Sequence, residues 1–335
     1  MHKTTILLLL LVFFAVTSCE KNESPYPDIT FTHNTSFPGA KRATASGFVL
    51  QEKAYVLLGR NEFQPVKGLV DCWQYNPANS MWTQMADFPG IGRVGAIAEV
   101  VDGKAYVGFG YDPSMSVYSS DTTIFADFWA YDPQLDNWER KADFPRNAYT
   151  NKPYLNSCAS FVYKKWVYIV GMSNNREYIK QVWRYNTLDN TWEQMNDFPG
   201  DARAAAVACT NGDQVFFGSG YLRYFKNDWW QYYPENDTWK KRASFQGGRV
   251  NAVAFSVNDR FFIATGRLIG GTLTDDYFYA DVLEYDSSKD CWYNRGKLPS
   301  GGRENALALV LQNKVLLGLG ETDNAVLSDF WIFQP

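Results

Sequence analysis

Histidine is almost missing from this sequence of 335 residues, which contains only His2 and His33. His2 lies in an N-terminal segment that we expect to be removed, so the mature chain keeps one imidazole. A single histidine excludes metal sites that need two of them, and it leaves a Ser-His-Asp or Cys-His relay without a credible base. The sequence also lacks a GxxxxGKS/T loop, a GxGxxG turn between strand and helix, and clustered carboxylates of the calcium-binding type. We therefore expect no metal and no cofactor.

A basic surface is missing as well. Lys and Arg total 32 against 36 for Asp and Glu, which gives a formal net charge of −4. Because phosphate contacts supply much of the affinity for nucleic acids, this balance argues against a nucleic-acid-binding protein. Beyond the N-terminal segment, the sequence has no apolar run long enough to span a membrane and no lasting 3.6-residue stripe. Aromatic residues are abundant at 17%, which is ample material for a large core.

The first residues have the pattern of a secretion signal. The apolar run from Ile6 to Val16 is too short for a stable membrane anchor and is typical of a signal-peptide core. The sequence Val16-Thr17-Ser18-Cys19 that follows resembles the bacterial lipobox, which implies that Cys19 becomes the lipid-modified first residue after cleavage. The alternative is an ordinary signal peptide with an incidental cysteine. We expect a lipoprotein of the bacterial cell envelope, attached to the outer membrane, with the side of that membrane left open.

The other cysteines show neither CxxC spacing nor a disulfide framework. We interpret them as small buried residues. They are Cys72, Cys158, Cys209 and Cys291.

Six copies of one unit fill the rest of the chain. A Tyr, six further residues and a Trp recur about every 50 residues. A sixth copy begins at Phe333, where the sequence stops. Four residues before each aromatic marker stands Asp71, Asp127, Gln181, Asp228, Asp281 or Asp329. The full pairs are Tyr75/Trp82, Tyr131/Trp138, Tyr185/Trp192, Tyr232/Trp239 and Tyr285/Trp292.

Each unit predicts four short β-strands, because apolar alternation, Gly and Asn/Asp turns and β-branched or aromatic residues dominate. A single four-stranded sheet leaves both faces apolar, whereas radial packing of such sheets buries them. The period, the glycine after the second strand and the Tyr/Trp pair resemble the kelch repeat over residues 28–335. This resemblance implies an all-β, six-bladed propeller of four-stranded antiparallel blades. The double glycine of the family is degenerate here, as in Gly108-Phe109-Gly110, which leaves the subfamily unassigned.

The two ends of the chain predict how the ring closes. The last copy stops after its third strand, and an unassigned segment from Asp28 to Pro38 ends in the Phe-Pro pair that terminates other units. We expect this segment to pair beside Phe330–Phe333 and complete the sixth blade, since an open ring would expose an apolar face and a sheet edge. The expected organisation is a signal peptide at 1–18, a lipid-attached tether at 19–27 and one propeller at 28–335.

An arginine recurs at the start of the first strand in every unit except the third, where Arg146 is displaced. First strands line the central channel of a propeller, so these guanidiniums are expected to ring one mouth and attract a carboxylate, sulfate or phosphate. The alternative, which we favour, is that each arginine hydrogen-bonds to carbonyls or to an acidic neighbour. The arginine then recurs in the sequence because the blade recurs. The five residues are Arg42, Arg93, Arg203, Arg249 and Arg303.

Connections between second and third strands are expected on the same face as these arginines. They are long and unlike one another, as binding loops on a rigid scaffold commonly are. Their aromatic rings suit sugar rings or peptide side chains, although any single Tyr more simply caps a blade. From these loops we expect ligand contacts by Tyr111, Arg176, Tyr221, Arg223, Arg267 and Glu321. The same loops carry Tyr118, Phe125, Tyr178, Tyr224, Phe225, Asp275, Asp276 and Tyr277.

These observations predict a recognition module that binds a protein or a glycan, with an anionic ligand favoured by the arginines. An alternative is a sugar mutarotase, because the sialic-acid mutarotase (N-acetylneuraminate epimerase) family also consists of kelch-type propellers of the bacterial envelope. Interchange of anomers needs only modest acid–base help and an anchor for the sugar carboxylate. This likeness is one of fold and compartment, and we assign no catalytic residue from it. A third hypothesis is a structural envelope component.

Overall fold

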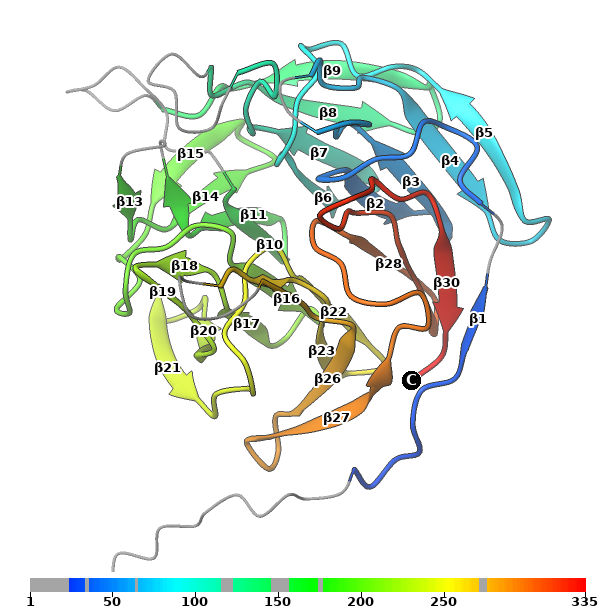
Figure 1. Cartoon of the computed structure of the whole chain (residues 1–335). Helices are drawn as coiled ribbons and strands as arrows, with labels where there is room; N and C mark the ends of the chain where they lie inside the picture. The colour runs from blue at the N-terminus through cyan, green and yellow to red at the C-terminus, as the bar shows by residue number, and fades with distance from the viewer. Residues whose placement is uncertain are drawn as a thin grey trace, which may run out of the picture.

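The computed structural model describes residues 24–33, 36–63, 66–115, 123–145, 157–173, 177–270 and 276–335. This part of the chain contains six four-stranded antiparallel sheets, arranged radially around a central channel (Figure 1). It contains no helix, and therefore none that is long and apolar enough to cross a membrane. The predicted all-β, six-bladed architecture is confirmed. The predicted signal peptide at 1–18 and the lipid-bearing Cys19 lie outside the described residues.

Each blade runs from an innermost first strand to an outermost fourth strand. Blade 1 is β2 (Ser46–Leu50), β3 (Lys53–Leu57), β4 (Cys72–Asn76) and β5 (Met81–Met85), and blade 2 is β6 (Ile97–Val101), β7 (Lys104–Gly108), β8 (Phe128–Asp132) and β9 (Asn137–Lys141). Blade 3 is β10 (Ala159–Tyr163), β11 (Trp166–Val170), β14 (Trp183–Asn186) and β15 (Thr191–Gln194). Blade 4 is β16 (Val207–Thr210), β17 (Val215–Gly218), β20 (Trp229–Tyr233) and β21 (Thr238–Arg242), and blade 5 is β22 (Val253–Val257), β23 (Arg260–Ala264), β26 (Asp281–Asp286) and β27 (Cys291–Lys297).

The sixth blade draws on both ends of the described chain. It consists of β28 (Leu307–Leu311), β29 (Lys314–Gly318), β30 (Phe330–Phe333) and β1 (Phe31–His33). β1 lies antiparallel beside β30, with Phe31 opposite Phe333 and His33 opposite Trp331 (Figure 1). The rings of Phe31 and Phe333 lie 4.9 Å apart. A strand from the N-terminal segment thus occupies the fourth position of this blade.

Small two-stranded hairpins extend the connection between second and third strands in blades 3, 4 and 5. They are β12 (Met172–Ser173) with β13 (Tyr178–Ile179), β18 (Tyr221–Leu222) with β19 (Tyr224–Phe225), and β24 (Arg267–Leu268) with β25 (Tyr277–Phe278).

The hydrophobic core is divided into layers between neighbouring blades. One layer joins Phe48 and Leu57 of blade 1 to Val107 and Tyr131 of blade 2. Strand residues on both faces are apolar because each sheet is covered on both sides, as radial packing requires. Each blade is therefore stabilised mainly by its two neighbours.

The repeating Tyr and Trp fasten one blade to the previous one. In blade 2 the Tyr131 hydroxyl donates to Asp136 at 2.7 Å, and Asp136 accepts from the backbone N–H of Ala86 in blade 1 at 2.9 Å. The Trp138 indole N–H donates to the Ala86 carbonyl at 3.1 Å. The indole contact recurs between Trp192 and the Ala142 carbonyl at 3.0 Å and between Trp292 and the Ala243 carbonyl at 2.8 Å, so the repeated Trp marks an inter-blade contact in blades 2, 3 and 5.

The cysteines of the described region are free. Cys72, Cys209 and Cys291 are buried and Cys158 is partly buried.

Candidate functional site

The start of each first strand and the end of each second strand meet at one face of the disc, because antiparallel strands alternate in direction. We call it the mouth face. Isolated bridges at this face pair Ala43 with Arg60, Val94 with Tyr111, Ala204 with Tyr221, Val250 with Arg267, and Glu304 with Glu321. Tyr111, Tyr221, Arg267 and Glu321, expected from the sequence as ligand contacts, therefore occupy equivalent positions around the channel mouth. Arg60 occupies the same position in blade 1 and was not predicted.

Glycine places these residues at the mouth. Gly110 precedes Tyr111 with a φ of 82°, and a Cβ there would lie 2.3 Å from the Val94 carbonyl oxygen. Gly320 precedes Glu321 with a φ of 88°, and a Cβ would lie 2.4 Å from the Glu304 carbonyl oxygen. Only glycine permits both the left-handed conformation and this close approach. The recurring glycine is therefore a positional requirement of the mouth.

Backbone hydrogen bonds between blades form part of a ring around the same opening. The backbone N–H of Thr44 donates to the Asn305 carbonyl, and the N–H of Asn305 donates to the Asn251 carbonyl. In the same way Asn251 donates to the Ala205 carbonyl and Ala205 to the Ser157 carbonyl, over N···O distances of 3.0–3.4 Å. All five residues have φ between 52° and 54°. Asn tolerates this conformation better than most residues, and its side chain remains free to reach across the mouth.

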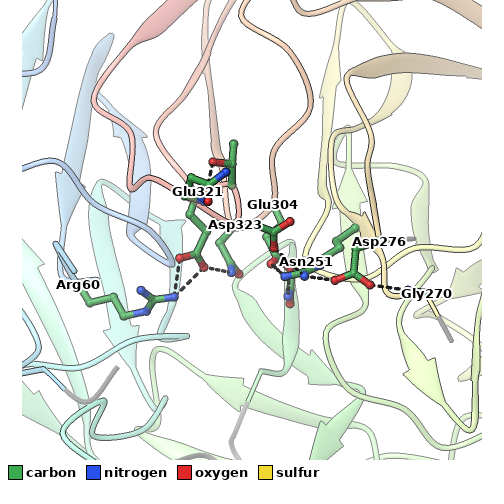
Figure 2. A network of polar contacts seen from close by, with 11 residues as sticks. Arg60, Asn251, Gly270, Asp276, Glu304, Glu321 and Asp323 are labelled. Carbon is green, nitrogen blue, oxygen red and sulfur yellow. Dashed lines mark hydrogen bonds and ion pairs between the residues drawn. The ribbon is translucent and has the colours of Figure 1, made fainter. Parts of the chain in front are cut away.

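A polar network lies on this ring and joins blades 5, 6 and 1 (Figure 2). The Arg60 guanidinium of blade 1 donates from Nη2 to both carboxylate oxygens of Glu321 in blade 6, at 2.7 and 2.6 Å. The Asn305 amide also donates to Glu321, at 2.7 Å. Glu321 is 4% exposed, so its charge is held by partners rather than by water.

Glu304 is held in the same way from blade 5. It accepts from Arg267 at 3.0 Å and from the Asn251 amide at 2.7 Å. The other terminal nitrogen of Arg267 contacts Asp276 and donates to Asp323 at 2.8 Å (Figure 2). The mouth network is defined here as Arg60, Asn251, Arg267, Asp276, Glu304, Asn305, Glu321 and Asp323.

One carboxylate of the mouth network, Glu321, has a perturbed pKa. Burial raises the pKa of Glu321 above its ordinary value, the Arg60 charge and the Asn305 hydrogen bond oppose that shift, and the nearby Glu304 adds to it. The network has two guanidiniums and four carboxylates, so its described members carry more negative than positive charge. The network presents paired hydrogen-bond donors and acceptors, and it is not a cationic site for an anion.

The side chains of the five predicted arginines are buried and are not exposed at the mouth. Each is at most 1% exposed. Arg42 shows the pattern: its terminal nitrogens grip both oxygens of Asp71 at 3.0 and 2.7 Å, one of them also donates to the Leu58 carbonyl, and Nε donates to the Ala40 carbonyl. The same bidentate pairing joins Arg93 to Asp127, Arg203 to Asp228, Arg249 to Asp281 and Arg303 to Asp329.

Blade 3 supports a structural role for these pairs. There the acidic marker is replaced by the neutral Gln181, whose side chain accepts from Trp183 at 3.1 Å. Loss of the arginine at its usual position thus coincides with loss of the carboxylate it would pair with. As they lie in the structure, the five arginines are unavailable to a ligand, and we assign them to blade assembly, the favoured alternative of the sequence argument.

Exposed aromatic side chains lie in three of the connections between second and third strands. Phe63, Tyr224 and Tyr277 are 47%, 74% and 52% exposed, and they lie in the second-to-third connections of blades 1, 4 and 5. Arg223 is exposed in the β18–β19 hairpin, next to Tyr224. Phe125 is buried, and its ring lies 4.1 Å from the Arg93 guanidinium, so we group it with the residues of blade assembly. The predicted Arg176, together with Tyr118 and Asp275, lies outside the described residues.

Comparison with known proteins shows similarity to two groups of proteins and to solved structures. Mouse Kelch-like protein 35 is 22% identical over 299 residues, which cover 89% of this chain and 47% of that protein. The N-acetylneuraminate epimerase of Pasteurella multocida is 24% identical over 241 residues, covering 71% of this chain and 55% of that protein. The solved structure of YjhT matches with a TM-score of 0.72 and 17% identity, over 90% of this chain and 99% of that one. No family model matches.

The chain forms a six-bladed β-propeller, and it is similar both to kelch proteins and to N-acetylneuraminate epimerases. It spans about half the length of the curated relatives named above. The matching solved structure has low sequence identity to this chain, so the match supports the fold alone.

Sequence reasoning missed five members of the mouth network, which are Arg60, Asn251, Glu304, Asn305 and Asp323. Arg60 was visible as the residue after the second-strand glycine, the position already singled out in Tyr111 and Arg267. Glu304, Asn251 and Asn305 follow the structural arginines by one or two residues, and aligning the repeats on those arginines identifies them.

Proposed function

We propose that this propeller recognises a hydroxyl-rich glycan at the channel mouth. The observation that carries the proposal is the mouth network, in which guanidinium and amide donors alternate with carboxylate acceptors. A sugar hydroxyl both donates and accepts, so it suits a surface that offers both. The exposed rings of Phe63, Tyr224 and Tyr277 add flat apolar faces against which sugar rings can pack.

A second candidate function is mutarotation of a sugar. It is favoured by the raised pKa of Glu321 and by similarity to N-acetylneuraminate epimerases. In such a reaction a base takes the proton of the anomeric hydroxyl, an acid protonates the ring oxygen, and the ring C–O bond breaks to give the open-chain carbonyl. Reclosure on the other face of the carbonyl gives the second anomer. Glu321 is the carboxylate of the mouth network suited to these proton transfers, because its pKa is raised.

We also propose that the propeller is attached to the bacterial cell envelope, at the outer membrane, through a lipid on Cys19. The support is the apolar run Ile6–Val16, which is followed by Thr17, Ser18 and Cys19. Partners other than the glycan and the membrane lipid are not part of the proposal.

The test uses residues 24–335 as a purified protein. Saturation-transfer NMR with a panel of neutral and acidic monosaccharides is expected to show saturable binding, weakened at least tenfold by Glu321→Gln. Arg140→Ala is the matched control, since Arg140 pairs with Asp143 on the exposed outer strand of blade 2. Parent-like binding by Glu321→Gln, or no binding to any sugar, contradicts the glycan proposal.

The same samples separate recognition from catalysis. Freshly dissolved N-acetylneuraminate is followed by NMR as its anomers equilibrate, with and without the protein. Acceleration that is lost in Glu321→Gln and kept in Arg140→Ala supports the mutarotase. Binding without acceleration leaves recognition as the function for that sugar.

A further inference from the structure

The first strands of all six blades enclose a cavity of about 420 Å³ at the centre of the propeller. This volume lies in the range of small-molecule sites. The cavity is lined by the middle residues of these strands, where one residue of each strand is small. The small residues are Gly47, Ala98, Ser160, Ala208, Ala254 and Ala308.

One wall residue breaks the repeat. Glu99 in β6 is opposite Tyr106 in β7, as Phe48 in β2 is opposite Tyr55 in β3. Five blades carry an apolar residue at this position, and blade 2 carries a carboxylate. Glu99 is the only acidic or basic residue among those lining the cavity. The apolar equivalents are Phe48, Phe161, Cys209, Phe255 and Leu309.

Glu99 has little support from the protein. It accepts one hydrogen bond, from the Ser160 hydroxyl of blade 3 at 2.6 Å, and this is its one hydrogen-bond partner in the described part of the chain. The Ser256 hydroxyl, which also lies on the cavity wall, donates instead to the Thr210 carbonyl at 2.6 Å. A carboxylate has about four acceptor sites, so Glu99 can accept further hydrogen bonds from a ligand in the cavity.

The surroundings of Glu99 favour a cation in the cavity. Burial raises the pKa of Glu99 to about 7, and the Ser160 hydrogen bond only partly opposes this shift. Burial and the Ser160 hydrogen bond are the influences on this pKa, and no cationic side chain of the described residues lowers it. An apolar residue of similar volume would avoid this cost, as it does in the other blades. Retention of a costly charge facing a cavity is typical of a binding site.

We propose that the central channel is a second ligand site, in which Glu99 and Ser160 bind the ammonium group of a small primary amine. The ammonium donates to the carboxylate and supplies the positive charge that the described residues around it lack. The methylene portion of the amine packs against the alanines of the cavity wall. This site is separate from the mouth network, and the proposal does not depend on the glycan.

Ethanolamine is the probe, measured by isothermal titration against residues 24–335. The parent is expected to bind it saturably, and Glu99→Gln is expected to lose at least tenfold in affinity while keeping an acceptor for Ser160. Because the ammonium needs the ionised carboxylate, affinity should rise about tenfold from pH 6 to pH 8. Ethylene glycol, which carries no charge, should not bind.

Two further variants make the result decisive. Glu99→Phe installs the residue of blades 1, 3 and 5, and it is expected to abolish binding while raising the melting temperature. Glu321→Gln is expected to bind ethanolamine like the parent, since it alters only the mouth. The proposal is overturned if the parent does not bind, if Glu99→Gln binds equally well, or if Glu321→Gln is the variant that loses binding.

Discussion

Arg93 shows how one charged side chain joins four segments of the chain. Its guanidinium pairs with Asp127 before the third strand, donates to the Phe109 carbonyl after the second strand, and donates to the Ile91 carbonyl before the first. The ring of Phe88, from the end of the previous blade, lies 4.8 Å from the guanidinium. The Phe-Pro terminator, the Arg and the Asp of each repeat are therefore parts of one contact.

Replacement of this arginine is expected to destabilise the fold. Arg93→Ala leaves Asp127 partly buried without its partner, and such a loss costs about 3–5 kcal/mol of unfolding free energy. Urea unfolding followed by tryptophan fluorescence measures the change. The control is Arg140→Ala, whose side chain is 59% exposed and whose effect should stay below about 1 kcal/mol. A normally stable Arg93→Ala protein that had lost a ligand would instead favour a binding role for the arginine.

The same pairs set a pH dependence of stability. Burial alone would raise the pKa of Asp329, but the hydrogen bond and charge of Arg303 hold it at about 2. The pKa values of Asp71, Asp127 and Asp228 are lowered by their arginines against the same effect of burial. Since an unfolded Asp has a pKa of about 3.9, the unfolded state takes up more protons on acidification.

Stability from these carboxylates is therefore complete at neutral pH and is expected to be lost progressively from about pH 5 to pH 2. Melting temperatures at pH 7, 5, 4 and 3 test this expectation. Asp329→Asn should melt at a lower temperature than the parent at pH 7, and the difference should shrink toward pH 3. A constant difference across that range would contradict the assignment.

At the scale of elements, the short strand β1 (Phe31–His33) and its flanking residues contact three blades. Its own pairing is three residues long, but the flanking Ile29 and Phe37 are 8% and 4% exposed and pack into two different core layers. The ring of Phe37 also lies 4.7 Å from the Arg42 guanidinium of blade 1. The segment therefore contacts blades 5, 6 and 1 together.

Removal of this segment is expected to lower the melting temperature sharply. A chain that begins at residue 39 exposes the edge of β30 and the apolar layers on both sides of blade 6. A chain that begins at residue 24 keeps every described contact and serves as the control. Differential scanning calorimetry compares the two, and equal melting temperatures would show that β1 is dispensable for closure.

At the scale of the whole molecule, the residues just before β1 and the mouth lie on opposite faces of the disc. β1 runs toward the mouth face, because the chain after it continues through Phe37 to Arg42 at the start of the first strand of blade 1. Before β1, the Tyr26 ring lies 4.2 Å from the Arg260 guanidinium beside the β22–β23 turn, and Arg295 donates to the Pro27 carbonyl at 2.7 Å. The chain toward Cys19 thus leaves from the face opposite the mouth.

A lipid on Cys19 would then present the mouth network away from the membrane. Fluorophores on Ile91→Cys at the mouth face and on Leu188→Cys at the opposite face report the orientation, since these side chains are 63% and 65% exposed. With the lipid-bearing protein in vesicles, a quencher in the lipid headgroups should quench the Leu188→Cys label more strongly. Stronger quenching at Ile91→Cys would reverse the orientation.

Contacts within a repeat were predictable from the sequence, and contacts between distant repeats were not. The strands, the Tyr/Trp fastening and the candidate partners of Arg42 lie within one period or its neighbour, so spacing alone indicates them. The pair Arg60–Glu321 joins residues 261 positions apart, and only closure of the ring brings blade 1 beside blade 6. Sequence spacing has no means of showing that proximity.

The sequence by itself determined the kind and number of the sheets, because strand period, turn residues and terminators are local properties that repeat. The tertiary structure decided which charged residues lie at the mouth and which lie inside a blade. Arg42 and Arg60 are equally arginine in the sequence, but burial against Asp71 commits the first to the fold, and the position after a left-handed glycine brings the second to the mouth. That distinction depends on which groups are removed from water when the blades pack, a property of the assembled ring and not of any single repeat.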